Sequence, residues 1–415
     1  MKTADKEVFL LTERFHPDTT SASGQYMTDI AIGLQERGLD VTVLTRSITG
    51  VEDTETQERI KQAGVTVKRV PIPDLEQSSF ARRLFNWFTY MLVAIPLLLI
   101  GRVQTERYVV FVSYPTVMPP LVWAVCKIRG WEFMYIIHDY HPEAAVELGY
   151  IERGGLIHRI WERLNQHLLV DATDIVVLGP KMRERVVESV SDRFGADFDE
   201  ATVSVIHNWA DGEFIQPQSK ADNQFSEQHG LVEQFSLVYS GNIGKFHDLE
   251  TVVGAASEFD PEELQILIIG EGDNKAHVSN LAAETGVLGE QVDLLPYQPW
   301  ETVPDSLTAG DVSIVAVNPE FEGLCVSSKL YSALATGQPV LVIAGESDDE
   351  SQLVRQFDAG IQATPGKTEE IVDAIERWRN DPKLRRRQGQ NARDAFEANF
   401  TREHSIDEYY ALIAD

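Results

Sequence analysis

The sequence predicts an α/β protein with two doubly wound parallel sheets, one in each half of the chain. Three observations predict this fold. Short apolar strands alternate with amphipathic helical segments along the 415 residues. The series of strands restarts after about residue 205. Loops rich in Gly, Pro and polar residues follow several strands, at the edge where open α/β sheets bind their ligands.

The first half of the chain begins with a strand, a polar loop and a helix: EVFLLTE, RFHPDTTSASGQY and MTDIAIGLQERGLD. Gly38 ends this helix, as glycine commonly does. Further apolar runs have the length and β-branched content of strands. They are DVTVLTRS, VTVKRVPI, YVVFVSYPTV, EFMYIIHDYHPE and TDIVVLG. Helices fit between them, so we expect a first parallel sheet.

The second half has the same alternation. Its expected strands are FSLVYSG, LQILIIGEG, QVDLLPY, DVSIVAV, PVLVIAG and the short GIQATP. The polar stretch 216–230 is typical of a linker or of a solvated approach to the second sheet. The tail is helical in pattern and broken near Asn399. We therefore expect domains over 1–205 and 206–395, followed by a last helix within 396–415.

Composition limits the function. The chain has 65 acidic and 36 basic residues and a net charge of −29, which argues against a nucleic-acid partner. Such an acidic surface is typical of a protein in a high-salt cytoplasm, so we expect a halophilic host. The only two cysteines, Cys126 and Cys325, lack metal-ligand spacing and favour a reducing compartment. The N-terminus does not resemble a signal peptide, and these features together predict a cytoplasmic protein.

The segment 84–101 carries no charge, while Arg82 and Arg83 precede it and Arg102 follows it. It is near the shortest length that spans a bilayer, and it contains Pro96. A spanning helix would place the first strands on the other side of the membrane from the later ones, which disfavours that alternative. Two alternatives remain open. The helix is half-buried in a membrane surface, or it is buried or lines a groove in the protein.

The stretch 319–343 predicts a loop, a helix and a strand. Ser327 and Ser328 are expected N-caps, Lys329 lies in the first helical turn, and Gly337 ends the helix. A helix N-terminus beside a lysine at the carboxyl edge of a parallel sheet suits a phosphate group. An ordinary βαβ crossover with a solvated loop is the alternative.

Three other loops hold candidate site residues. In the first, Gly24 would let a ligand approach the backbone, and a plain turn is the alternative. IHDYHPE places His138 and His141 at a strand end, where they suit catalysis, hydrogen bonding or metal binding, although no H-x-x-E-H cluster follows. SGNIGKFHD suits a diphosphate. Its Lys245 is either a cation for a leaving group or a solvated surface lysine.

Two further segments give weaker signals. IIGEGDNKAHV has a short G-x-G but no third glycine at the dinucleotide spacing, so it argues little for NAD or FAD. HNWADGEF is typical of a turn at the domain junction.

In their order and spacing, these motifs resemble the GT-B glycosyltransferases, and specifically the retaining family 4. The resemblance covers nearly the whole chain. NWAD, GNIGK and SKLYS together are similar to the branch that contains colanic-acid and N-acetylfucosamine transferases. The resemblance implies two Rossmann-like domains facing a cleft, the first for the acceptor and the second for the nucleotide sugar. FTREHSIDEYYALI resembles the helix that crosses back to the first domain.

The resemblance also implies roles for individual residues. His138 resembles the residue that lines the reaction centre, and Lys245 matches the cation at the leaving diphosphate. The implied donor-binding residues are Gly24, Asn242, Gly244, Gly270, Glu271, Gly272, Tyr297, Glu322, Gly323, Leu324, Cys325, Val326, Ser328 and Lys329.

One departure from the family pattern concerns the nucleotide. The family often has two glutamates separated by seven residues before this helix, and the second binds the ribose. Leu324 and Ser332 occupy those positions here. Glu320 or Glu322 could take over the first role, and the nucleotide stays unassigned.

The function implied by the resemblance is retaining transfer of a sugar from a nucleotide-diphospho-sugar to a lipid-linked or polysaccharide acceptor, at the inner membrane face. The fold requires no metal or other cofactor, and no Asp-x-Asp motif appears between the strands. A nucleotide-sugar 2-epimerase of the same fold and a non-catalytic nucleotide-sugar-binding protein are alternatives. A dehydrogenase is the least favoured.

Overall fold

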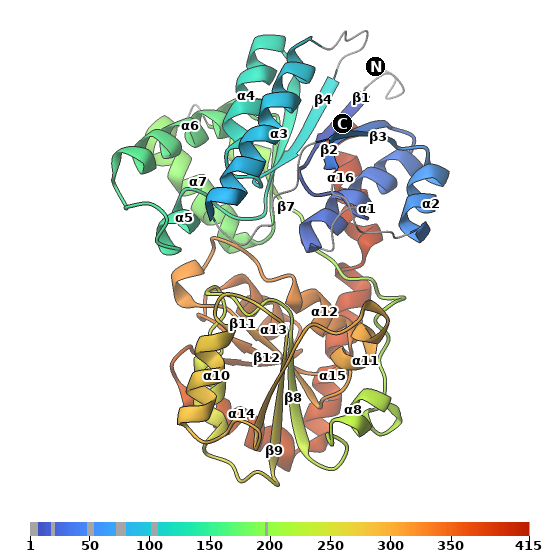
Figure 1. The fold of residues 1–415 in the computed structure, drawn as a ribbon, viewed down its shortest axis with the longest axis vertical. Helices are drawn as coiled ribbons and strands as arrows, with labels where there is room; N and C mark the ends of the chain where they lie inside the picture. Colours follow the sequence, from blue (N-terminus) through green and yellow to red (C-terminus); the bar gives the residue numbers. More distant parts are fainter. Residues whose placement is uncertain are drawn as a thin grey trace. The chain divides into compact units, whose positions relative to one another are not determined.

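The computed structural model describes residues 7–17, 21–47, 54–71, 80–100, 107–195 and 198–414. The chain forms two compact units (Figure 1). The first unit contains residues 1–207 and 403–415, and the second contains residues 208–402.

The first unit is built on a parallel sheet of order β3-β2-β1-β4-β5-β6-β7. The chain order reverses between β1 and β4, so loops that follow neighbouring strands diverge there. The strands are β1 (Glu7–Leu11), β2 (Asp40–Ser47), β3 (Thr66–Pro71), β4 (Arg107–Val112), β5 (Glu132–Ile137), β6 (Asp174–Val177) and β7 (Val203–Val205).

The helices of this unit pack against one another in neighbouring pairs. α3 packs against α4, α4 against α6 and α6 against α7, while α1 packs against α2. The helices are α1 (Ala22–Glu36), α2 (Thr54–Ala63), α3 (Phe80–Ile100), α4 (Met118–Arg129), α5 (Glu143–Glu147), α6 (Leu156–Asp171), α7 (Pro180–Phe194) and α16 (Arg402–Ala414).

The last helix, α16, packs on α1. Gly33 permits this contact, because a Cβ atom there would lie 2.5 Å from Cγ2 of Ile406. Arg37 also pairs with Asp407 at 2.6 Å. The helix begins at Arg402, after α15 has ended at Asn399, which confirms the break that the sequence predicts near Asn399.

The second unit has a parallel sheet of order β10-β9-β8-β11-β12-β13, which reverses between β8 and β11. Its strands are β8 (Phe235–Ser240), β9 (Leu264–Ile269), β10 (Val292–Leu295), β11 (Val312–Ala316), β12 (Val340–Ile343) and β13 (Gly360–Ala363). Its helices are α8 (Gln224–Gln228), α9 (Glu250–Ala256), α10 (Lys275–Glu284), α11 (Val303–Leu307), α12 (Lys329–Ala335), α13 (Asp349–Gln356), α14 (Thr368–Asn380) and α15 (Pro382–Asn399). The two sheets and their alternating helices confirm the predicted fold class.

The polar stretch 216–230 is part of the second unit and not a linker, and most of its residues are exposed, as expected of a solvated approach to the second sheet. Phe225 is buried there. The side chain of Asn223 donates to the carbonyl oxygen of Asp305 at 2.8 Å, and Lys220 pairs with Asp311 at 2.5 Å. Polar contacts with the rest of the unit therefore hold a few residues of this otherwise exposed segment in place.

In the described part of the chain, the structure contains no helix that meets the length and hydropathy of a membrane span. One face of α3 is buried, including Tyr90, Ala94 and Leu98, while Phe88 and Leu92 on another face are exposed. The exposed side lines an apolar groove with α4. The groove-lining alternative for segment 84–101 is therefore confirmed for the part up to Ile100, and contact with a membrane stays a prediction.

Candidate functional site

The loops that follow β8 and β9 lie against each other in the second unit. The amide of Gly241 donates to the carbonyl oxygen of Ile269 at 2.9 Å, and the amide of Ile243 donates to that of Glu271 at 2.8 Å. Gly270 has φ +151°, and a Cβ atom there would lie 1.8 Å from the carbonyl oxygen of Gly241. The short G-x-G is therefore explained by the close approach of two backbones.

This paired loop presents the predicted diphosphate residues. Asn242 and Lys245 are exposed, and Gly244 between them is buried. A Cβ atom on Gly244 would lie 2.7 Å from Nδ2 of Asn242, so glycine is needed for this amide to fold back over the loop. Within the described residues, Lys245 forms no ion pair and its ammonium group faces solvent. An exposed, unpaired cation can bind an anion with little competition from the protein.

A neighbouring lysine balances the negative charge of Glu271 beside this loop. Lys275 donates to Oε1 of Glu271 at 2.7 Å and to the carbonyl oxygen of Gly270 at 2.8 Å. Tyr297, which is half-exposed, donates to the carbonyl oxygen of Glu271 at 3.4 Å. The tyrosine ring therefore lies at the edge of the same loop, where the sequence placed it.

Beneath the loop, Lys329 and the buried His247 form a pair that the sequence did not predict. Nζ of Lys329 lies 3.0 Å from Nε2 of His247, and Nδ1 of His247 lies 2.9 Å from the carbonyl oxygen of Ala316. The carbonyl needs a donor, so Nδ1 carries the proton and Nε2 accepts from the lysine. Lys329 also lies 5.4 Å from the centre of the Tyr239 ring. A Cβ atom on Gly241 would lie 2.5 Å from Cε of this lysine.

Burial shifts the pKa of both groups. It lowers the pKa of Lys329 to about 8, while Cys325 and Glu350 act in the opposite direction. Burial and the charge of Lys329 lower the pKa of His247 to about 3, so the imidazole is neutral at pH 7. Lys329 is thus a weakly hydrated cation directly under a glycine turn, which is a favourable arrangement for a phosphate oxygen.

The loop that follows β11 is held by aromatic and carboxylate contacts. Phe321 packs on Phe246 with ring centroids 4.2 Å apart, which joins this loop to the one after β8. Gly323 has φ +67°, a conformation that favours glycine. Leu324 and Val326 are buried, so their backbones rather than their side chains are available to a ligand.

The prediction that serine side chains cap α12 is wrong. Ser328 occupies the N-cap position but makes no side-chain cap hydrogen bond. The amide of Ser327 instead donates to Oε1 of Glu350. Glu322 accepts a hydrogen bond from Ser347. The loop after β12 therefore fixes the loop after β11, and the Glu350 carboxylate binds the backbone just before α12 and not the amides of its first turn.

The acidic run after β12 is buried. Asp348, Asp349 and Glu350 are each at most 1% exposed. Burial raises the pKa of Asp348 to about 7 and raises that of Glu350. The sequence reasoning missed these residues because an acidic run in an acidic protein normally indicates a solvated surface; the apolar strand just before them was the only available signal.

In the first unit, Gly24 lies inside a helix and not in the preceding loop. α1 begins at Ala22, and the side chain of Ser21 caps it by accepting from the amide of Gly24 at 3.3 Å. The carbonyl oxygen of Gly24 accepts from the amide of His16 at 3.4 Å. The prediction that Gly24 lies in a loop is wrong. α1 starts several residues before the apolar pattern from which the helix was predicted.

His138 directly follows β5, as predicted. Its amide and that of Asp139 both donate to Oγ of Ser113 at 3.1 Å. The ring of Tyr26 meets the imidazole edge to face at 6.3 Å, which links α1 to this loop. Burial lowers the pKa of His138 to about 4, so the ring is uncharged at pH 7. Burial raises the pKa of Asp139 to about 6, against the charge of Arg14.

His141 has a different role from His138. It stacks on Trp161 with ring centroids 5.3 Å apart, which is a packing contact. In the ranges that the structure describes, no three His, Cys, Asp or Glu side chains are grouped as metal ligands would be.

The structure thus brings the predicted residues together in two groups. In the second unit, the loops after β8, β9 and β11 gather the residues predicted to bind the donor, with Lys329 beneath them. In the first unit, His138 and Gly24 belong to elements joined through Tyr26. Both groups follow the carboxyl ends of strands near the point where the strand order reverses, as ligand sites in such sheets do.

Comparisons with known proteins agree with this arrangement. Residues 21–209 match the glycosyl transferase 4-like domain, and residues 221–395 match the glycosyl transferases group 1 family. Together the two matches cover most of the chain. The chain therefore belongs to the glycosyltransferases of the GT-B fold, with a 4-like domain followed by a group 1 domain.

Individual relatives support this assignment. The chain is 24% identical over 374 residues to the putative colanic acid biosynthesis glycosyl transferase WcaI of Escherichia coli, covering 87% of this chain and 89% of WcaI. It is 25% identical over 239 residues to the probable glycosyltransferase WbjE of Pseudomonas aeruginosa, covering 57% of each chain.

Solved structures show the same fold. The complex of Anabaena HepE with UDP-glucose has a TM-score of 0.70 at 14% identity and covers 98% of this chain and 99% of HepE. WaaG, a glycosyltransferase involved in lipopolysaccharide biosynthesis, has a TM-score of 0.67 at 14% identity and covers 98% of this chain and 99% of WaaG.

Proposed function

We propose that this glycosyltransferase moves a sugar from a nucleotide-diphospho-sugar to a lipid-linked or polysaccharide acceptor, with retention of the anomeric configuration and without a metal or other cofactor. It works in the cytoplasm, on the inner membrane face. The observation that carries the proposal is the cluster of Asn242, Lys245 and Lys329 around the glycine loops after β8 and β9. Structures of HepE with UDP and with UDP-glucose support the nucleotide-sugar donor.

In the proposed reaction, the donor diphosphate leaves while the acceptor hydroxyl enters on the same face of the sugar. The acceptor proton passes to the leaving phosphate oxygen. Lys245 reaches the diphosphate from solvent, and Lys329 stabilises it from beneath Gly241. Charge that develops on a leaving group is stabilised most by cations that are already in place, which is the contribution of these two lysines.

His138 has a different proposed role. Its low pKa keeps it neutral at pH 7, so it can donate a hydrogen bond to a hydroxyl of the transferred sugar without adding a positive charge beside the anomeric carbon. His247 holds Lys329 through Nε2 and acts on the donor only through that lysine.

Binding and product analysis test the proposal. A thermal-shift panel of UDP-, GDP-, ADP- and TDP-sugars at high salt should raise the melting temperature with one nucleotide, because a ligand that binds the native state stabilises it. NMR of the product with that donor should show the anomeric configuration of the donor. An inverted product contradicts the retaining mechanism.

Two further measurements separate the proposed transfer from the two alternative functions. Isotope exchange at the sugar C2 in the absence of any acceptor indicates a 2-epimerase. Tight donor binding with neither hydrolysis nor transfer indicates a non-catalytic binding protein. Either result overturns the proposed transfer.

A further inference from the structure

The outer surfaces of α3, α4 and α6 form a continuous row of neighbouring helices with exposed apolar side chains. α3 packs against α4, and α4 packs against α6. Most monomeric proteins expose large apolar side chains singly, and a contiguous patch indicates a binding surface. Those exposed on this row are Leu84, Phe85, Phe88, Leu92, Val93, Leu97, Leu99 and Ile100 of α3, Val117 just before α4, Leu121 and Ile128 of α4, and Leu156, Ile157, Ile160 and Leu164 of α6.

The exposed residues repeat at helical spacing in each element. Leu84, Phe88 and Leu92 are four residues apart on α3, and Leu156, Ile160 and Leu164 are four apart on α6. Side chains four residues apart lie on one face of a helix. Leu84, Phe88 and Leu92 therefore form an apolar stripe toward solvent on α3, and Leu156, Ile160 and Leu164 form one on α6.

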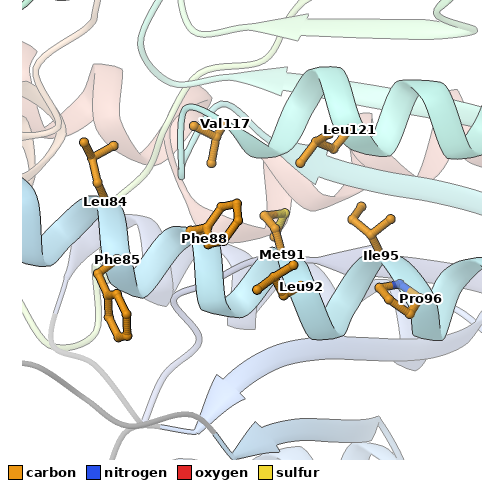
Figure 2. Close-up of a pocket in the computed structure, with 9 residues that line it drawn as sticks. All are labelled: Leu84, Phe85, Phe88, Met91, Leu92, Ile95, Pro96, Val117 and Leu121. Atoms are coloured by element: carbon orange, nitrogen blue, oxygen red, sulfur yellow. The ribbon is translucent and has the colours of Figure 1, made fainter.

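A groove runs between α3 and α4 on this surface. It has a volume of about 740 Å³ and is lined only by apolar residues. Figure 2 shows Phe88, Met91 and Ile95 pointing from α3 toward Val117 and Leu121. A groove without a polar group suits a hydrocarbon chain, which requires no hydrogen-bond partner.

This region lacks the acidic excess of the whole chain. Residues 80–171, from the start of α3 to the end of α6, contain nine Lys and Arg against eight Asp and Glu, whereas the whole chain has a net charge of −29. Arg159 and Arg163 are exposed, lie four residues apart beside the apolar stripe of α6, and form no ion pair with any described side chain. Arginines that flank an apolar stripe are typical of helices at an anionic membrane surface.

We propose that the α3–α4–α6 surface binds an anionic phospholipid bilayer, with its apolar stripes among the acyl chains and Arg159 and Arg163 at the lipid phosphates. The inference rests on the proposed function, in which a lipid-linked acceptor requires the enzyme at a membrane, and it adds α4 and α6 to the segment that the sequence suggested. A second copy of the chain fits this surface less well, because a symmetric dimer would bring the positively charged Arg159 and Arg163 of both copies into the same interface.

Vesicle sedimentation with the full chain tests this proposal. Vesicles of phosphatidylcholine with phosphatidylglycerol should bind the protein, and vesicles of phosphatidylcholine alone should bind it much less. Arg159→Gln with Arg163→Gln should weaken binding by about thirtyfold, since each basic residue near an anionic surface contributes about 1 kcal/mol. Arg377→Gln with Arg386→Gln is the matched control, because both arginines are exposed on the second unit, and it should leave vesicle binding unchanged.

A second double variant tests how much the apolar side chains contribute to vesicle binding. Leu156→Ser with Ile160→Ser should reduce binding to the same vesicles, and circular dichroism should show an unchanged fold because both side chains are exposed. Equal binding to both kinds of vesicle, or unchanged binding by the double arginine variant, overturns the proposal. Self-association that the serine variant abolishes, without vesicle binding, indicates a second copy instead and also overturns it.

Failure of this inference is distinguishable from failure of the proposed function. Thermal shift by the donor nucleotide sugar depends on the second unit and should be the same in wild type and in the double arginine variant. A donor response without vesicle binding contradicts only the membrane proposal. Vesicle binding without a response to any nucleotide sugar supports the membrane surface and contradicts the proposed function.

Discussion

The two units differ in how they use large apolar side chains. The second unit places nearly all of them in its core, and its described residues expose only Leu288, Tyr297 and Trp300 among the large hydrophobic side chains. The first unit has an equally apolar core but exposes a row of such side chains on α3, α4 and α6. Both units have the same architecture, so the fold does not require this row.

The units also differ in how their candidate sites are held. In the second unit, backbone contacts between glycine loops and the Lys329–His247 pair fix the arrangement. In the first, His138 is positioned by two amide hydrogen bonds to Ser113 and by one aromatic contact. The difference fits the proposals of a rigid site for the charged donor in one unit and of a surface for an external partner in the other. Substitutions in each unit can test it.

The largest effect is expected for Gly270→Ala in the second unit. The new Cβ atom would lie 1.8 Å from the carbonyl oxygen of Gly241, and φ is +151°. The loops after β8 and β9 would have to separate, which should lower the free energy of unfolding by about 3 kcal/mol or more. Urea denaturation measures this change, and nucleotide-sugar binding should be lost with it.

Gly38→Ala in the first unit is the matched control. Gly38 also has positive φ, at +93°, but a Cβ atom there would meet nothing within 4 Å. Only the backbone strain remains, so the loss should be about 1 kcal/mol. Equal losses at the two glycines would show that the approach of the two loops contributes nothing.

The second prediction separates chemistry from stability. Lys245→Ala should lower turnover by about 10²- to 10³-fold, the effect of removing one preorganised group that stabilises transition-state charge. Its side chain is exposed, so the free energy of unfolding should change by less than about 0.5 kcal/mol. Steady-state kinetics and urea denaturation measure the two quantities.

Lys367→Ala is the control for that prediction, since Lys367 is another exposed lysine of the second unit that pairs with Glu369 at 3.8 Å. It should leave turnover unchanged. Near-normal transfer by Lys245→Ala would contradict the role proposed for this residue and leave it a solvated surface lysine.

The fold could be predicted from the sequence because it depends on local patterns. Runs such as DVSIVAV have strand character wherever they occur, and their alternation with helices nearly determines a parallel sheet. Lys245 and the loop glycines were found for the same reason, since they directly follow such strands. Their roles in donor binding and transfer stay predictions.

The remaining parts of the site depend on contacts between distant residues. Lys329 and His247 are 82 residues apart in the chain, and Glu350 accepts from the amide of Ser327, 23 residues earlier. No local pattern distinguishes a buried Asp348 from a solvated one. The exposed stripe of α6 was also missed, because no local pattern distinguishes an apolar stripe that faces solvent from one that faces the core.

The third prediction concerns pH and the Lys329–His247 pair. Lys329 has a pKa of about 8 in the folded protein, so it loses its proton as the pH rises through that value. Donor affinity should fall about tenfold between pH 7 and pH 9, because roughly a tenth of the lysine stays charged at the higher pH. Titration of the donor at each pH measures this, and Lys329→Gln should bind weakly at both values.

His247→Asn provides the check on positioning. The change removes the acceptor that Nε2 offers to Lys329 while keeping a polar side chain. If His247 acts only through the lysine, this variant should weaken donor binding but retain its fall with pH. A pH response that survives in Lys329→Gln would show that another group is responsible.

The smallest expected effect tests whether the exposed row of the first unit takes part in folding. Leu156 is 76% exposed and Leu168, on the same helix, is fully buried. Leu156→Ala should change the free energy of unfolding by less than about 0.5 kcal/mol, whereas Leu168→Ala should cost about 2–5 kcal/mol through the cavity it leaves. Urea denaturation in the absence of lipid measures both. A large loss at Leu156 would mean that the stripe packs within the protein in solution, and the difference between the two units would then be one of packing and not of partners.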